Sequence, residues 1–227
     1  MGWTDNPPTK PIDKNMTDKY ELIDIERWLR REHYEHFSRM RSPHYAIAAN
    51  VDVTPLLAFK RREQLSFYLS LIYLATRALN DIDNFHLRFV DGRPVRFERI
   101  HTNFTHRRVE DDLFRYYTAP FEGTLREYVE RTAEGMAAQT TLFGGISARP
   151  NVTYFSCAPS LYATAITNPG LDDPDDAIPR INWGSYVERD GRWLLNITVT
   201  ANHRFIDGHH IERFFHLLQE YINGLGE

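Results

Sequence analysis

One histidine and one aspartate near the C-terminus are spaced so that both can act at the same corner of a fold. His203 and Asp207 lie in the segment 202–208, with the sequence NHRFIDG. Histidine titrates near neutral pH, so a positioned imidazole can take a proton from a hydroxyl as its oxygen attacks an acyl carbon. Asp207 can orient that imidazole, or it can pair with an arginine from elsewhere and brace the corner. The segment suggests general-base chemistry, although the same short pattern also suits a structural histidine.

Ser156 is the best placed hydroxyl for stabilising the oxyanion that acyl transfer creates. It lies near the end of an apolar stretch, 152–157, just before Ala158 and Pro159. One such donor is typically worth about 10²- to 10³-fold in rate. A serine nucleophile is less favoured, because the sequence contains no Gly-x-Ser-x-Gly elbow. These residues suit acyl transfer with His203 as base and Ser156 as oxyanion donor, although a serine at the end of a strand is more often structural.

Other polar clusters match no known site. The histidines form no His-Glu-x-x-His pattern and no cysteine-containing zinc set, so we expect no metal site. The glycine pair 144–145 lacks the Lys-Ser/Thr of a phosphate loop and predicts a turn. The basic cluster 60–62 predicts a solvated helix start, with phosphate binding as the alternative. Cys157, the only cysteine, is expected to fill apolar space. The histidines considered are His33, His36, His209 and His210.

The elements around His203 are predicted to hold it at a strand-to-helix corner. The stretch 193–201 alternates large apolar residues with smaller or polar ones, as a half-buried strand does. From Gly208 onward, apolar residues recur at the spacing of one buried helical stripe. A strand and helix anchored in a core can present His203 to a cleft. The stripe consists of Ile211, Phe214, Phe215, Leu218, Tyr221 and Ile222.

The rest of the chain predicts hairpins and helices without a regular strand-helix alternation. We expect an α/β protein of the α+β type, in which helices cover a mixed sheet, and not a Rossmann fold. Residues 1–20 are expected to form an extended arm and 21–227 a single domain. The expected helices are 25–38, capped by Asp24, then 63–79 and 124–138. The expected strands and hairpins are 45–53, 85–90 and 94–100 around a turn at 91–93, two short strands around 107–112, 152–157, and a hairpin at 190–191, with a loop at 168–179.

Composition favours a small molecule as the substrate. The chain has 227 residues, a formal net charge of -4 and a pI near 6.2, so nothing in its charge predicts nucleic acid or a membrane surface as a partner. A single cysteine allows no intrachain disulfide. We find neither a signal peptide nor a run of roughly 20 apolar residues, and we expect a cytoplasmic location.

Three separated segments resemble the chloramphenicol acetyltransferase family. They are 28–35 (WLRREHYE), the pair 67–68 leading into a helix at 69–80, and 202–219. The likeness covers roughly residues 22–224. It implies an acetyl-CoA-dependent O-acetyltransferase that forms a homotrimer with active sites at the subunit interfaces. Acetyl-CoA would be a co-substrate, no cofactor would be permanently bound, and chloramphenicol is the first acceptor to expect.

The resemblance also assigns roles to individual residues. It implies that His203 is the base, that Asp207 is structural, and that Arg30 pairs with Asp207. It places the serine that stabilises the intermediate at Ser156, in agreement with the chemistry above. The remaining residues that it implies are Phe37, Tyr45, Phe114 and Asn182 for the acceptor, with Asn182 in place of a threonine, and Tyr186 for stacking on the adenine of the coenzyme.

The sequence departs from the family pattern on both the acceptor side and the donor side. Asn202 replaces the first histidine of the family's pair and makes the corner similar to that of dihydrolipoamide acyltransferases. Ser160 stands where a tryptophan is usual, which puts the acceptor in question. Ser66 and Ser185 replace lysines near the 3′-phosphate of the coenzyme, so 60–62 would have to compensate, or the donor would be a carrier-protein thioester. The alternatives are therefore acylation of another alcohol or amine, and a silent trimeric homologue.

Overall fold

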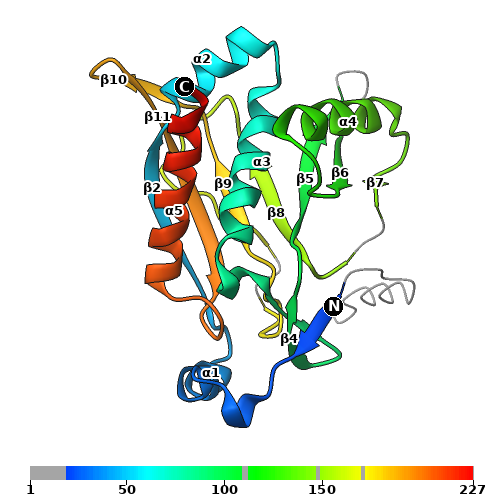
Figure 1. The fold of residues 1–227 in the computed structure, drawn as a ribbon, viewed down its shortest axis with the longest axis vertical. Coiled ribbons are helices and arrows are strands. Elements are labelled where there is room, and N and C mark those ends of the chain that lie inside the picture. The colour runs from blue at the N-terminus through cyan, green and yellow to red at the C-terminus, as the bar shows by residue number, and fades with distance from the viewer. Residues whose placement is uncertain (1–18, 109–111, 147–148, 170–171, 227) are drawn as a thin grey trace, which may run out of the picture.

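An eight-stranded mixed sheet forms the centre of the molecule (Figure 1). The computed structural model describes residues 19–108, 112–146, 149–169 and 172–226. β8 runs parallel to both of its neighbours, β5 and β9, whereas β11 is antiparallel to β9 and to β2. The predicted mixed sheet is therefore confirmed. Its strands are β2 (His44–Asp52), β5 (His101–Arg107), β6 (Phe114–Ala119), β7 (Phe143–Gly145), β8 (Val152–Cys157), β9 (Arg180–Trp183), β10 (Val187–Arg189) and β11 (Arg192–Asn202).

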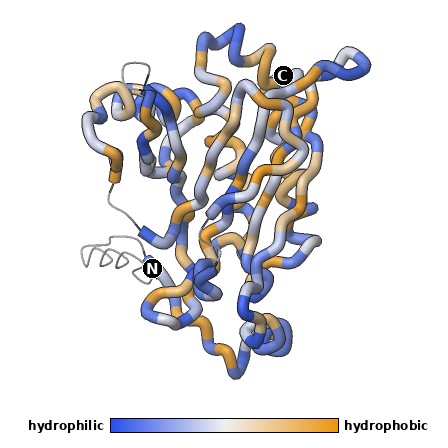
Figure 2. The backbone as a smooth tube through the Cα atoms, turned by 180° about the vertical axis from the view of Figure 1, so that it is seen from behind, coloured by the Kyte–Doolittle hydropathy of each residue, from blue (hydrophilic) through white to orange (hydrophobic). Residues whose placement is uncertain are grey.

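Helices cover one face of this sheet. α3 (Phe67–Asn80), α4 (Leu125–Ala138) and α5 (Gly208–Asn223) lie in front of the strands in Figure 1. Alternate strand residues point at the helices, because successive side chains of a strand face opposite ways. Figure 2 shows the molecule from behind, where the strands face the viewer. The residues that form the core beneath α3 and α5 include Phe104, Phe155, Ile181, Ile197, Val199, Ile211, Phe214, Leu218 and Ile222.

A second, three-stranded sheet contains the first strand of the described chain. β3 (Leu87–Val90) and β4 (Arg93–Phe97) form the predicted hairpin, and β1 (Tyr20–Leu22) pairs with β4. Asp91 and Gly92 both have positive φ, 51° and 71°, as a two-residue hairpin turn requires. Residues 1–18 of the predicted arm lie outside the described residues. None of the helices in the described ranges has the length and apolar character needed to cross a membrane.

The helix predicted over 25–38 is wrong in its first half. A 3-10 turn covers Ile25–Arg27, and α1 begins only at Arg31 and ends at Ser38. Trp28 packs on Phe205, and the Arg30 side chain bonds to the same loop. Residues two apart point to opposite sides of a helix, so the chain is extended at Trp28 to direct both inward. Leu29, which lies between these two residues, is fully exposed.

The helix predicted over 63–79 begins later, at Phe67, as α3, and a separate helix that the sequence did not predict precedes it. α2 (Thr54–Glu63) ends at Gln64, whose left-handed φ of 57° breaks the helical path, and Ser66 then caps α3. The basic residues 60–62 lie in the last turn of α2, where positive charge favours the helix dipole, and not at a helix start. The glycines 144–145, predicted as a turn, belong to β7. The strands 45–53 and 152–157, the helix 124–138 and the hairpin at 190–191 are confirmed within one or two residues.

Candidate active site

The strand β11 delivers His203 to a tight turn that leads directly into α5. Nine residues of β11 pair with β2, which fixes the direction in which the strand ends. Beyond the strand, the backbone N–H of His203 donates to the carbonyl of Pro43 at 2.8 Å. Asp207 then caps α5, in a capping box in which its own N–H donates to Nδ1 of His210 at 2.9 Å. The predicted strand-to-helix corner is therefore present.

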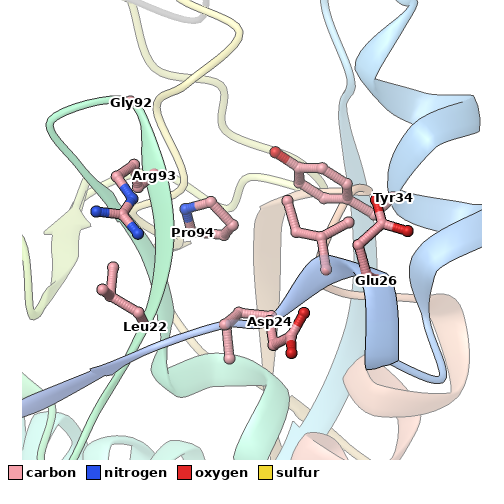
Figure 3. Close-up of a pocket in the computed structure, with 9 residues that line it drawn as sticks. Leu22, Asp24, Glu26, Tyr34, Gly92, Arg93 and Pro94 are labelled. Carbon is pink, nitrogen blue, oxygen red and sulfur yellow. The ribbon is translucent and has the colours of Figure 1, made fainter.

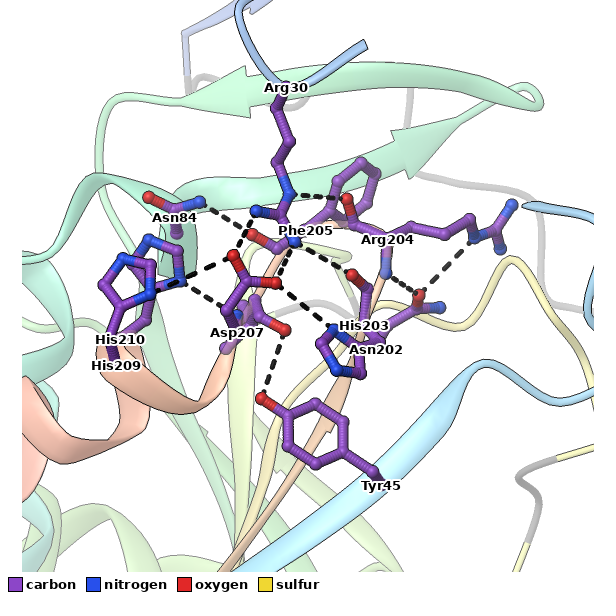
Figure 4. A network of polar contacts seen from close by, with 11 residues as sticks. Arg30, Tyr45, Asn84, Asn202, His203, Arg204, Phe205, Asp207, His209 and His210 are labelled. Carbon is purple, nitrogen blue, oxygen red and sulfur yellow. Dashed lines mark hydrogen bonds and ion pairs between the residues drawn. The ribbon is translucent and has the colours of Figure 1, made fainter. Parts of the chain in front are cut away.

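The Arg30 guanidinium ties this corner together (Figure 4). Its Nε donates to the carbonyl of Arg204 at 2.9 Å, and one terminal nitrogen donates to the carbonyl of His203 at 3.0 Å. Both terminal nitrogens also donate to the Asp207 carboxylate. Burial opposes ionisation of Asp207, but the hydrogen bonds and positive charge of Arg30 outweigh it and lower the pKa of this carboxyl. The chain thus forms the Arg30–Asp207 pair that the resemblance implied.

Two aromatic rings hold the His203 imidazole between them. The ring centroid lies 4.0 Å from that of Phe37 and 4.3 Å from that of Tyr45, and both pairs are stacked. Nδ1 lies 3.2 Å from Oδ1 of Asp207, outside hydrogen-bond geometry, and no described residue gives this nitrogen a hydrogen bond. Asp207 is therefore close enough to interact with the ring electrostatically, while its own hydrogen bonds go to Arg30. Nε2 is the nitrogen left for a substrate.

Asp207, His209 and His210 bring three possible metal ligands within 4.8 Å of one another. Their lone pairs are already engaged in part, since Asp207 accepts from Arg30 and Nδ1 of His210 accepts the Asp207 N–H. Burial, together with the neighbouring His209, lowers the pKa of His210 to about 4, so this ring is neutral at physiological pH. The arrangement supports a cap on α5 better than a metal centre.

Ser156 lies in a pocket of about 930 Å³ on the face of the sheet opposite α3 and α5. Its neighbours follow from strand register, because residues directly opposite one another share a face. Ser156 pairs with Asn182 of β9, and its hydroxyl lies 3.3 Å from that of Thr105 on β5. A second row, two residues away, runs across four strands. We call the polar residues around Ser156 the polar floor; they are Asn103, Thr105, Thr118, Tyr154, Arg180 and Asn182.

An aromatic wall completes the pocket at the β6 and β7 side. The rings of Tyr116 and Phe143 are stacked with centroids 5.3 Å apart, and Phe114 meets Tyr116 edge to face. Phe114 and Asn182, both implied as acceptor residues, therefore line the same pocket as Ser156. Phe37 and Tyr45 do not line it, because they belong to the His203 corner.

A single chain does not bring His203 and Ser156 together. Ser156 is in register with Asn182, and Asn182 with Thr198 of β11. His203 follows Thr198 by five residues, which is about 16 Å of extended strand. In addition, β8 and β11 are two strand spacings apart across the sheet, which is about 10 Å. The candidate base and the candidate oxyanion donor of one chain are therefore too far apart to act on the same substrate group.

The residues implied for the coenzyme occupy a third region. Tyr186 is 37% exposed and packs against Phe67 and Trp193. Ser66 accepts the N–H of Leu69 as the N-cap of α3. A separate hollow of about 500 Å³, near β1 and the β3–β4 hairpin, is lined by none of the predicted site residues (Figure 3).

Sequence reasoning missed most of the polar floor. Asn103, Thr105, Tyr154 and Arg180 were not singled out, because single polar residues on short strands are common. The available signal was their alternation with apolar residues on three neighbouring stretches. Without the strand register, that signal does not show that they meet at Ser156.

Known proteins with the same architecture support the assignment of this fold to a class. A solved chloramphenicol acetyltransferase superimposes with a TM-score of 0.82 at 25% identity, over 90% of this chain and 100% of that one. The dihydrolipoamide acetyltransferase of Azotobacter vinelandii shares the fold, with a TM-score of 0.63 at 16% identity, over 95% of this chain and 96% of that one. The Azotobacter match shows the fold alone, whereas the first match, together with the sequence likenesses below, defines the protein as an acyltransferase.

The family follows from the sequence itself. A chloramphenicol acetyltransferase family model matches residues 18–219, and the chain belongs to that family. The chloramphenicol acetyltransferase of Streptomyces acrimycini is 29% identical over 204 residues, 88% of this chain and 93% of the relative. Chloramphenicol acetyltransferase 3 of Escherichia coli is 26% identical over 208 residues, 90% of this chain and 97% of the relative. The family uses acetyl-CoA as co-substrate and a small acceptor.

Proposed function

We propose that this acyltransferase moves an acetyl group from acetyl-CoA directly to the hydroxyl of a small acceptor, in sites formed between the subunits of a homotrimer. The observation that carries the proposal is the separation of His203 from Ser156. Each side chain reaches the surface of a different region, and a rotated neighbouring copy can supply the missing half. In a trimer with cyclic symmetry, the contact between the His203 corner of one subunit and the Ser156 pocket of the next occurs three times.

In this mechanism His203 acts as general base. Nε2 takes the proton of the acceptor hydroxyl while its oxygen attacks the thioester carbonyl, and a C–O bond forms. The tetrahedral oxyanion accepts a hydrogen bond from the Ser156 hydroxyl of the neighbouring subunit. When the C–S bond breaks, the leaving thiolate recovers the proton from the imidazolium. Arg30 and Asp207 keep the corner in shape, and Phe37 and Tyr45 fix the plane of the ring.

Thiol release from acetyl-CoA, measured with and without chloramphenicol, tests the activity. Chloramphenicol is the reference acceptor because the relatives carry its name. Release that depends on an acceptor and disappears in His203→Ala supports the transferase. No release with chloramphenicol or with a panel of other alcohols and amines would favour the silent homologue, and release only from carrier-protein thioesters would change the donor.

Mixed subunits test where the site is formed. We expect a mass near three times 26.7 kDa in solution. His203→Ala and Ser156→Ala subunits, unfolded together and reassembled in equal amounts, should regain about a quarter of wild-type activity, because three quarters of random trimers are mixed and each has one intact site in three. A matched control mixes His203→Ala with the double variant, which cannot form an intact site. Absence of recovery in the first mixture contradicts an intersubunit site.

A further inference from the structure

The polar floor contains a buried acceptor atom that the described residues leave without a hydrogen bond. Asn182 is 1% exposed, and its side-chain nitrogen donates to Oδ1 of Asn168 at 2.6 Å and, at 3.5 Å, to the carbonyl of Ile166. These two acceptors fix which end of the amide is the nitrogen. Oδ1 of Asn182 then remains as an acceptor, and it has no partner within the described ranges. A buried carbonyl without a partner is costly, so this atom points to a ligand that donates.

The floor carries hydrogen-bonding groups but no net charge. Arg180 is its one charged residue among the described lining, and its guanidinium donates to Asp176 at 2.5 Å. The side chains of Arg180 and Asp176 are 7% and 19% exposed, so the carboxylate neutralises the positive charge of the guanidinium beside the pocket. The same guanidinium lies 5.8 Å from the centre of the Tyr154 ring. An anionic acceptor therefore gains little here, whereas a neutral polar acceptor fits.

The opposite side of the pocket is aromatic. Phe114, Tyr116 and Phe143 offer flat apolar surface, and Asn103 with Thr118 adds a hydrogen-bonded polar pair at 2.7 Å on the floor. A molecule that fits both sides has an apolar ring face and several hydroxyls along its edge. Saturated rings that carry many hydroxyls combine the two.

We propose that the acceptor is an uncharged polyhydroxylated ring compound, of the glycoside or cyclitol class, and that Asn182 accepts a hydrogen bond from one of its hydroxyls. The proposal rests on the acetyl transfer proposed above and narrows its acceptor. A site built to hydrogen-bond a substrate hydroxyl rejects an analogue that lacks it, since the buried partner stays unpaired. Aryl alcohols that contact the aromatic wall but give Asn182 no hydrogen bond should therefore be poor acceptors.

The test compares acceptors and variants in one assay. Acetyl-CoA thiol release is measured with methyl β-D-glucopyranoside and myo-inositol, and with benzyl alcohol and chloramphenicol as the less hydroxylated reference compounds. We expect a kcat/KM at least tenfold higher for one of the polyols than for benzyl alcohol. In Asn182→Leu, the KM of that polyol should rise at least tenfold, and by a larger factor than the KM of benzyl alcohol.

Asn196→Leu is the matched control. Asn196 lies on β11, and its Oδ1 is also buried without a described partner, but it faces Asn50 of β2 and does not line the pocket. It should leave the acceptor preference unchanged. Equal losses with every acceptor in Asn182→Leu would overturn the proposal, as would a preference for chloramphenicol or benzyl alcohol over both polyols.

Binding separates this proposal from the proposed activity. Calorimetry of methyl β-D-glucopyranoside and myo-inositol on His203→Ala, which keeps the floor intact, needs no turnover. If either polyol binds, and adding Asn182→Leu weakens its binding at least tenfold, the result supports polyol binding by the polar floor. This holds even if no acceptor is acetylated and the transferase proposal fails. Absence of binding by both polyols overturns the floor, even if chloramphenicol is acetylated.

Discussion

At the His203 corner, one partly buried guanidinium makes hydrogen bonds to two backbone carbonyls and to a carboxylate, whereas on the polar floor a more deeply buried amide oxygen has no partner within the described chain. The corner is closed by contacts within the chain from three distant segments, at Arg30, Tyr45 and Asp207. The floor is assembled from neighbouring strands, and its groups face a pocket of about 930 Å³. The corner is thus suited to holding one shape, and the floor to receiving a ligand.

This difference separates two kinds of effect on substitution. Buried polar groups that are paired stabilise the fold when intact and destabilise it when one partner is removed. Polar groups that wait for a substrate contribute to rate or affinity and cost stability. We therefore expect Arg30 and Asp207 to affect stability and Ser156 to affect rate. His203 is the exception, because we propose a catalytic role for it although it lies at the corner that holds one shape.

Replacing His203 should have the largest effect on activity. His203→Ala removes the general base, and we expect kcat to fall by about 10⁴-fold, the upper end for proton-transfer catalysis. The exposed neighbour His209, on the same corner, serves as control, and His209→Ala should keep most of the activity. A steady-state assay with acetyl-CoA distinguishes the two. Comparable losses in both variants would contradict a specific role for His203.

Replacing Ser156 should reduce rate without reducing stability. Ser156→Ala removes the oxyanion donor, with an expected loss in kcat of about 10²- to 10³-fold and little change in the KM for acetyl-CoA. The melting temperature should be unchanged or slightly higher, because Ser156 belongs to the polar floor, whose groups face a ligand pocket and do not brace the fold. Ser160→Ala, on the exposed loop that follows, is the control. A drop in melting temperature without a drop in kcat would show that Ser156 stabilises the fold and does not contribute to the rate.

Breaking the Arg30–Asp207 pair should reduce stability first. Arg30→Met leaves a partly buried carboxylate without its partner, and we expect a loss of about 3 kcal/mol in the free energy of unfolding. Arg31 pairs with Glu26 and Glu35 at the surface, so Arg31→Met should change little. Urea unfolding of both variants measures the difference. Equal stability of Arg30→Met and the wild type would show that the pair does not brace the corner.

The corner could be predicted from sequence because its key residues are local. His203 and Asp207 lie four residues apart, between a strand and a helix with clear periodicity. Assigning Arg30 as the partner of Asp207 needed the family resemblance, because 177 positions separate them. Tertiary contacts at Trp28 and Arg30 also explain why the first half of the helix predicted over 25–38 was wrong, since they overrode helical periodicity there.

The floor could not be predicted, because strand register creates it. Thr105, Ser156 and Asn182 come from strands separated by loops of different length, and a shift of one residue in any pairing would turn a side chain to the helix face. The sequence found Ser156 and, through the resemblance, Asn182 and Phe114. Tyr154 and Arg180 belong to the floor only because β8 and β9 are paired in this register.

The smallest expected effect is a pH dependence that belongs to the corner alone. Burial lowers the pKa of His210 from its ordinary 6.5 to about 4 in the folded chain. The unfolded chain then binds the additional proton between these values, so the stabilisation is complete above pH 6.5 and is lost as the pH falls toward 4. The lowered pKa of Asp207 acts in the same direction at lower pH, since its contribution is lost as the pH falls through that pKa. His210→Gln keeps a side-chain acceptor for the capping box and removes the titration. Melting temperatures at pH 7.5 and pH 5 should therefore differ less in His210→Gln than in the wild type; an equal difference in both would mean that the neutral ring at the start of α5 does not set the acid sensitivity of the corner.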